Sequence, residues 1–143
     1  MSPLGTGLVY VPQLLPLLRD ASDVVSVVEV EPQTLWRRRN LGAGIVLDSE
    51  SIAVIRSLPQ HRLAHGVGLP IGGSVAGDAE EVRLFVDTLD ELNPAWCSEH
   101  LSFNRTRSGG QTRMTGFLLP PPQTREAVAV AARNIAAFSA KHQ

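Results

Sequence analysis

Residues 24–31 have the sequence Val-Val-Ser-Val-Val-Glu-Val-Glu, and this segment decides the class of fold. Its run of valines predicts a β-strand. Because side chains alternate between the two faces of a strand, one face carries Val25, Val27, Glu29 and Glu31. A strand that is buried on both sides is expected to be apolar, so Glu29 and Glu31 are out of place unless the protein uses them.

Strand and helix signals alternate along the rest of the chain. Strands are predicted at residues 7–11, 24–31, 63–71 and 95–103, and helices at 14–19, 49–57, from 78 to 93, and from 124 onward. Residues 32–48 and 104–115 are expected to be irregular loops. This βαβαβαβα order predicts a parallel sheet with right-handed crossovers. Since a full barrel takes roughly 250 residues, residues 1–143 are predicted to form a single domain, the first four βα units of a TIM-type barrel. A small doubly wound open sheet is the alternative.

Three of the helices carry local signals. Ser49 is expected to cap the helix that follows it. Asp78 and Glu81 form a capping-box pattern at the start of the next helix, and the Asn93-Pro94 pair is expected to end that helix. The last helix is expected to open at Thr124, with one apolar face formed by Val128, Ala131, Ala132, Ile135 and Phe138.

Composition excludes several classes of protein. The chain is 43% hydrophobic and 19% charged, with a net charge of -1, which is typical of a globular protein rather than a disordered one. It has no extended basic surface for nucleic acid and no apolar run of the ~20 residues that a membrane helix needs. Its single cysteine, Cys97, excludes an intrachain disulfide. With no signal-peptide pattern at its start, the expected location is cytoplasmic.

Two histidines lie on predicted neighbouring strands. His65 shares a face with Leu63, and His100 shares a face with Ser98. Two imidazoles on adjacent strands can hold one metal ion, and a carboxylate from residues 24–31 would complete a set typical of non-haem iron(II). We therefore predict that Glu29, His65 and His100 point to one side of the sheet, near the carboxyl ends of the strands. The alternatives are hydrogen-bonded core histidines and a solvated strand end at Glu29 and Glu31.

The motifs around these histidines resemble a known family. Residues 63–69 (Leu-Ala-His-Gly-Val-Gly-Leu) and residues 98–102 (Ser-Glu-His-Leu-Ser) are similar to its two histidine strands, and residues 118–122 (Leu-Leu-Pro-Pro-Pro) to its segment before a helix. The family is that of the multinuclear non-haem iron-dependent oxidative enzymes that modify cysteine in ribosomal peptide precursors, such as those that make methanobactin. The resemblance covers nearly all of this chain and corresponds to the N-terminal half of a family member.

The resemblance implies a function and a set of ligands. His65 and His100 would bind one iron, with Glu29, Glu31, Ser98 and Glu99 as further ligands or as residues that support the ligands. The reaction would be an oxygen-dependent oxidation of a peptide, with a separate precursor-binding protein as partner. The remaining iron ligands of the family lie on later strands, so this chain alone would be an incomplete enzyme.

A half barrel also implies a partner surface. We expect its inner face to expose Val25, Val27, Val67 and Leu69, and therefore expect a homodimer or a missing second half-barrel. Two other functions remain open at this point. One is a non-catalytic scaffold or interaction module that keeps the barrel fold, and the other is a metal-dependent hydrolase.

Overall fold

The structure is a computed structural model that describes residues 4–39 and 44–140. Residues 40–43, which belong to the segment predicted to be irregular, lie outside the described residues, as do residues 1–3. The chain forms two compact units: Met1–Gly66 with Asp87–Ser98 (the first unit), and Val67–Val86 with Glu99–Gln143 (the second unit). In chain order the elements are β1 (Gly7–Val9), η1 (Pro12–Leu14), α1 (Leu15–Asp20), β2 (Val27–Val30), η2 (Pro32–Leu35), β3 (Trp36–Arg38), β4 (Ile45–Leu47), α2 (Ser49–Arg56), β5 (His61–Gly66), α3 (Ala79–Leu92), β6 (Cys97–Glu99), β7 (Phe103–Ser108), β8 (Gln111–Leu119) and α4 (Arg125–Ser139).

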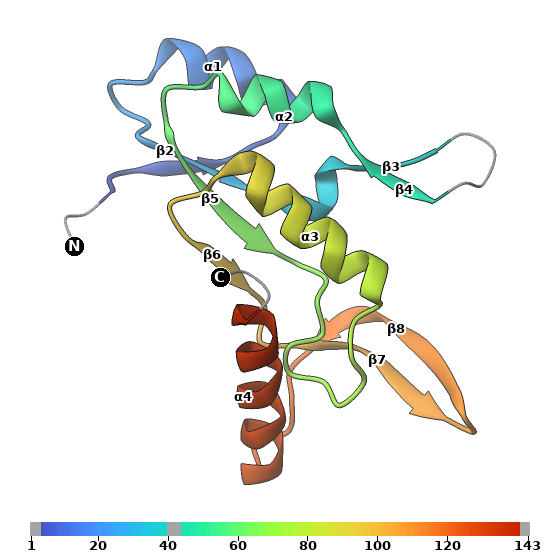
Figure 1. Cartoon of the computed structure of the whole chain (residues 1–143). Helices are drawn as coiled ribbons and strands as arrows, with labels where there is room; N and C mark the ends of the chain where they lie inside the picture. Colours follow the sequence, from blue (N-terminus) through green and yellow to red (C-terminus); the bar gives the residue numbers. More distant parts are fainter. Residues whose placement is uncertain (1–3, 40–43, 141–143) are drawn as a thin grey trace. The chain divides into compact units, whose positions relative to one another are not determined.

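The first unit is built on a four-stranded parallel sheet with the order β1-β2-β5-β6 (Figure 1). Its register pairs Val27 with His61 and Glu29 with Leu63. These four strands neighbour one another in chain order, without the reversal that marks a doubly wound sheet. Chain order is the arrangement of the first strands of a barrel. The predicted α/β class with a parallel sheet is confirmed.

The core of the first unit lies between the strands and the helices α1 and α2. Leu18, Val28, Val30 and Ile55 are all 0% exposed and belong to one apolar cluster. The expectation that the inner face would expose four apolar side chains was wrong. Val25 belongs to this cluster, Val27 and Leu69 are buried as well, and Val67 is half-buried.

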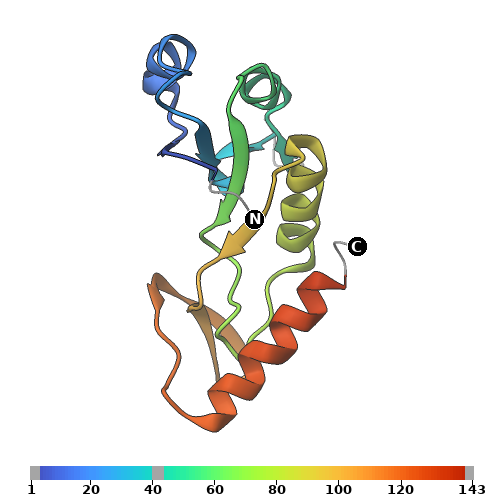
Figure 2. The same cartoon turned by 90° about the vertical axis from the view of Figure 1, so that its left-hand side faces the viewer.

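Two segments expected to be loops contain β-hairpins. Within the predicted irregular segment 32–48, η2 is followed by the antiparallel pair β3 and β4. Within the predicted polar loop 104–115, β7 and β8 form a longer antiparallel hairpin (Figure 2). Its turn is Gly109-Gly110, with φ of +58° and +78°, the geometry of a type I′ turn that joins two twisted strands. A Gly-Gly pair between two strand-like runs is the sequence signal that was missed.

The third and fourth predicted strands end earlier than expected. β5 ends at Gly66 rather than residue 71, because the Leu69 N–H donates to the side chain of Glu99 and not to a neighbouring strand. β6 ends at Glu99 rather than residue 103, and a tight turn follows in which the Ser102 N–H donates to the His100 carbonyl at 2.8 Å. His65 therefore lies inside its strand, whereas His100 directly follows its strand.

The helix signals agree with the structure except at the cap of α2. The Asp78 carboxylate accepts the Glu80 N–H at 2.8 Å and Glu81 accepts the Asp78 N–H at 3.3 Å, which confirms the capping box. Helix α3 ends at Leu92, and the following Asn93 has a φ of +45°. Asp48, and not Ser49, caps α2 by accepting the Ser51 N–H.

The apolar face of α4 is covered only in part. Thr124 caps this helix as predicted, with its hydroxyl accepting the Ala127 N–H at 3.2 Å. On the apolar face of this helix, Ala131 is buried and Phe138 half-buried, whereas Val128 and Ile135 are 69% and 50% exposed. The covered side of this helix includes Asn134 and Phe138, which are both half-buried. The edge of the Phe138 ring meets Phe85 of α3, with 5.3 Å between the ring centres.

Among the described residues, no helix is both long enough and apolar enough to span a membrane.

Candidate functional site

His65 is held by a side chain of the neighbouring strand. It lies near the carboxyl end of β5, and its Nδ1 is 2.8 Å from the hydroxyl oxygen of Ser98 on β6. The side chain of His65 is half-buried, so this contact fixes the ring partly out of solvent. In the tautomer in which Nδ1 carries the proton and donates to Ser98, Nε2 carries the lone pair that a metal takes. A hydrogen bond of this kind orients a histidine ligand and sets its tautomer.

Glu99, in the second unit, accepts two backbone hydrogen bonds. One carboxylate oxygen accepts the Leu69 N–H at 3.1 Å and the other accepts the His100 N–H at 2.8 Å. Its side chain is 8% exposed, and burial raises the pKa of this carboxyl, against the opposing effect of backbone N–H donors and of the nearby His100. Glu99 therefore uses its oxygens to join the segment after β5 to the segment after β6.

His100 lies beside this carboxylate. Its Nδ1 is 4.0 Å from the Glu99 carboxylate, and its side chain is 41% exposed. The ring is therefore partly in contact with solvent, while its backbone N–H is held by Glu99.

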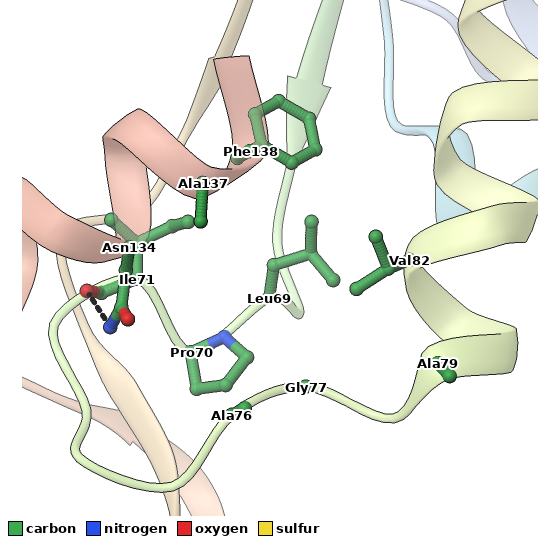
Figure 3. Close-up of a pocket in the computed structure, with 10 residues that line it drawn as sticks. All are labelled: Leu69, Pro70, Ile71, Ala76, Gly77, Ala79, Val82, Asn134, Ala137 and Phe138. Carbon is green, nitrogen blue, oxygen red and sulfur yellow. Dashed lines mark hydrogen bonds between the residues drawn. The ribbon is translucent and has the colours of Figure 1, made fainter. Parts of the chain in front are cut away.

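Helix α4 supports the segment that reaches Glu99. The Asn134 side-chain amide donates to the carbonyls of Ile71 and Gly73, both at 2.9 Å. Figure 3 shows the first of these bonds at the rim of a cavity of about 210 Å³. Its other walls are mostly apolar and include Leu69, Val82 and Phe138. The loop that presents the Leu69 N–H to Glu99 is thus held by α4 from one side.

The predicted carboxylates of residues 24–31 lie in the first unit. Glu29 is half-buried and, with Val27 and Leu63, lines an open cavity of about 730 Å³. Because Glu29 pairs with Leu63 in the register, alternation puts the His65 side chain on the same face of the sheet as Glu29. Glu31 follows β2 and is also half-buried, and its carbonyl accepts the Thr34 hydroxyl at 2.7 Å.

The described residues offer metal donors but do not assemble a complete metal site. No three His, Cys, Asp or Glu side chains come together closely enough to hold an ion in the described parts of the chain. The structure brings His65 to Ser98, and Glu99 to His100, as two separate pairs. Each imidazole fits one position of an iron site.

Two contacts that support these segments are not indicated by the sequence pattern. Asn104 donates from its side chain to the Gly68 carbonyl at 2.7 Å, and Arg105 pairs with Glu81 at 2.8 Å. Both residues had been placed in a polar loop. No pattern in the sequence identifies Asn134, because its partners are backbone carbonyls more than sixty residues away.

Comparison with known proteins agrees with these motifs. Residues 5–141 match the family described as RiPP precursor modification enzyme MbnB/TglH/ChrH, where RiPP denotes a ribosomally made, modified peptide. A UPF0276 protein of Chromobacterium violaceum is 38% identical over 71 residues, which are 50% of this chain and 24% of that protein. One of Streptomyces avermitilis is 27% identical over 143 aligned positions, which cover 94% of this chain and 26% of that protein. One of Caulobacter vibrioides is 34% identical over 76 residues, which are 50% of this chain and 24% of that protein.

The matched segments thus span about a quarter of the length of these relatives. The family match, in contrast, runs through all four parallel strands and all four α-helices of this chain. The chain therefore belongs to the family of RiPP precursor modification enzymes MbnB/TglH/ChrH.

Proposed function

We propose that this chain supplies two histidine ligands, His65 and His100, to the iron site of an oxygen-dependent enzyme that modifies cysteine-containing ribosomal peptide precursors. The observation that carries the proposal is the contact of His65 Nδ1 with Ser98 at 2.8 Å, near the carboxyl end of a parallel strand. Active sites of barrels lie at this end of the strands. Family membership supports the peptide substrate.

The residues of the chain have distinct parts in this proposal. His65 binds through Nε2 while Ser98 holds the other ring nitrogen. His100 binds through its exposed ring, and Glu99 is a positioning residue that fixes the His100 backbone. Glu29, on the same face as His65, is the first candidate for a carboxylate ligand. Iron, when bound, supplies the oxygen-dependent oxidation. Its remaining ligands come from a longer form of the protein or from a second copy.

Iron retention tests the ligand assignment. The purified chain is loaded with iron(II) without oxygen, desalted, and assayed for iron beside His65→Ala and His100→Ala. His61→Ala is the matched control, because His61 lies on the same strand β5 with an exposed side chain. We expect weak binding that is kept in the control and lost in the other two variants. Equal retention in all four folded proteins, or none in the wild type, contradicts the assignment.

Substitution of Ser98 separates a ligand from a folded-core histidine. If Ser98 orients a metal-binding ring, Ser98→Ala should lower iron(II) affinity by about tenfold or more. Its thermal stability should change little compared with this loss. An affinity unchanged in Ser98→Ala, with His65→Ala still defective, would leave His65 as a ligand but remove the positioning part of the proposal.

Turnover tests the completeness of the site. Because two imidazoles cannot hold the several irons of a multinuclear centre, we expect no repeated oxidation of a cysteine-containing precursor peptide by the 143-residue chain. The measurement is the mass of the peptide after addition of oxygen to the iron-loaded chain. Repeated turnover that disappears in His65→Ala and His100→Ala would show that the chain is sufficient by itself.

A further inference from the structure

The hairpin of β7 and β8 leaves the backbone edge of β8 open. β7 starts against the segment after β5: Gly72 N–H donates to the Ser102 carbonyl at 2.8 Å, just before the strand, and Asn104 donates to Gly68. β8 has no strand on its other side within the described residues, and all of its nine residues except Thr115 are exposed. An exposed strand edge of this kind is a template on which another extended chain can pair.

Only the outer half of β8 is a regular edge. The register runs from Ser108 with Gln111 to Arg105 with Met114, and then shifts before Phe103 pairs with Leu119. In the shifted part the Thr115 hydroxyl donates to the Phe117 carbonyl at 2.6 Å, and Phe117 is 76% exposed. A bulge interrupts strand pairing, so the segment that can pair is Gln111–Met114 with Phe117 next to it.

The hairpin is also positively charged. Residues 103–119 contain three arginines and no aspartate or glutamate. Arg105 is 7% exposed and pairs with Glu81, whereas Arg107 and Arg113 are exposed and no described carboxylate pairs with them. Since the whole chain has a net charge of -1, this charge is local to the hairpin. An acidic partner is the complement to such a surface.

We propose that the β8 edge at Gln111–Met114 binds an extended acidic peptide as an added strand. Main-chain hydrogen bonds along the edge would provide affinity, and alternate side chains would provide specificity. The proposal goes beyond the metal chemistry, because it requires neither iron nor oxygen.

The register indicates which peptide fits. Arg113 lies opposite Thr106 and so shares a face with it, whereas Met114 lies opposite Arg105 on the other face. A strand that pairs with β8 would therefore place acidic side chains beside Arg113 and apolar side chains beside Met114. The preferred sequence alternates acidic and apolar residues.

A peptide fits this surface better than a nucleic acid does. Proteins that bind nucleic acid by charge neutralise about six to ten phosphates, and the hairpin offers only two arginines without an acidic partner. Those two side chains also lie on opposite faces, because Arg107 pairs with Thr112 and Arg113 pairs with Thr106. A continuous track of phosphates would not contact both.

The test uses a fluorescein-labelled peptide of alternating glutamate and valine with the metal-free chain, by fluorescence anisotropy. Arg113→Glu should lower its affinity about tenfold, because an attractive cross-strand pair becomes a repulsive one. The same variant should gain affinity for a peptide of alternating lysine and valine. Arg107→Glu is the matched control with the same change in net charge, and its effect should be clearly smaller.

The backbone contribution is tested on the peptide. Methylation of the backbone nitrogens of the valines, or of the glutamates, removes alternate N–H donors. Only one of the two patterns should abolish binding, since only alternate residues of a strand face a given neighbour. No binding by the wild type, equal losses in the two arginine variants, or indifference to both methylation patterns would each overturn the proposal. Tighter binding of oligouridine than of the peptide would make this a nucleic-acid surface instead. Because no iron is present, a negative result here leaves the ligand assignment intact.

Discussion

Ile55 in α2 is fully buried, whereas Ile135 in α4 is 50% exposed, although both lie in helices that are capped by a polar side chain. The two helices differ in what covers them. Ile55 belongs to one apolar cluster with Leu18 and Val28, whereas Ala131 is the buried residue of α4. An apolar stripe shows that one face of a helix can be buried. Whether this face is buried depends on the apolar side chains that other elements of the same unit place against it.

Matched isoleucine substitutions should give the largest effect. Ile55→Ala removes a fully buried side chain and is expected to lower the free energy of unfolding by ~2–5 kcal/mol. Ile135→Ala is expected to change it by less than ~1 kcal/mol, because half of this side chain already contacts water. Urea denaturation followed by circular dichroism measures both values.

Equal losses in these two variants would break the comparison. They would mean that the exposed face of α4 is covered in solution by a second copy of the chain. Light scattering would then have to show a dimer, which we predicted from the half-barrel fold. A monomer with equal losses would contradict the 50% exposure of the Ile135 side chain.

For ion pairs, the larger loss of stability is expected in the second unit and the smaller loss in the first unit. In the second unit Arg105 is 7% exposed and pairs with Glu81, whose side chain is 34% exposed. We expect Arg105→Met to cost ~1–3 kcal/mol, because it removes a buried charge-assisted hydrogen bond. In the first unit the side chains of Arg56 and Glu91 are 57% and 53% exposed, so Arg56→Met should cost less than ~1 kcal/mol. A larger loss for Arg56→Met than for Arg105→Met would contradict this order.

The helix cap of α2 should give a smaller effect that depends on pH. Hydrogen bonds from Ser51, and then the pairing with Arg37, hold the pKa of Asp48 below its ordinary value of 3.8 despite burial. The charged form therefore stabilises the fold fully above pH 3.8, and this stabilisation is lost as the pH falls through the lower folded pKa. At pH 7 we expect Asp48→Ala to cost ~1 kcal/mol.

Asp48→Asn is the control for this prediction. Asparagine caps helices as well as aspartate does but carries no charge. Its stability should lack the part that titrates below pH 3.8 in the wild type. Thermal denaturation between pH 3 and pH 7 compares the three proteins, and parallel pH profiles for the wild type and Asp48→Asn would show that the charge of Asp48 contributes nothing.

The sequence predicts the first unit better than the second for a physical reason. In residues 24–31 the valines of β2 (Val27, Val28 and Val30) are buried, and this strand has a neighbour on each side, so composition and burial agree there. The β7–β8 hairpin has no buried face on β8, and its residues are polar at most positions. Without apolar alternation, only the Gly109-Gly110 turn distinguishes this hairpin from a loop.

The candidate site shows a similar limit. Periodicity identified His65 and Ser98, because both lie inside strands where alternation holds. His100 follows its strand, and the partners of Glu99 are the backbone N–H groups of Leu69 and His100. Backbone partners leave no trace in the side-chain pattern. The metal assignment therefore stays a prediction that depends on the family and on iron measurements.

The Gly109-Gly110 turn has a consequence for chemical synthesis and labelling of this chain. A methyl group added at either glycine would meet no atom within 4 Å, yet both residues have a positive φ. The position is therefore selective for chirality and not for size. D-alanine at residue 109 or 110 fits a positive φ and should tighten the turn by about 0.4–1 kcal/mol, because it restricts the unfolded chain. The tip can then carry a D-amino acid with a bulky reporter group, while an L-residue of the same size would strain the turn.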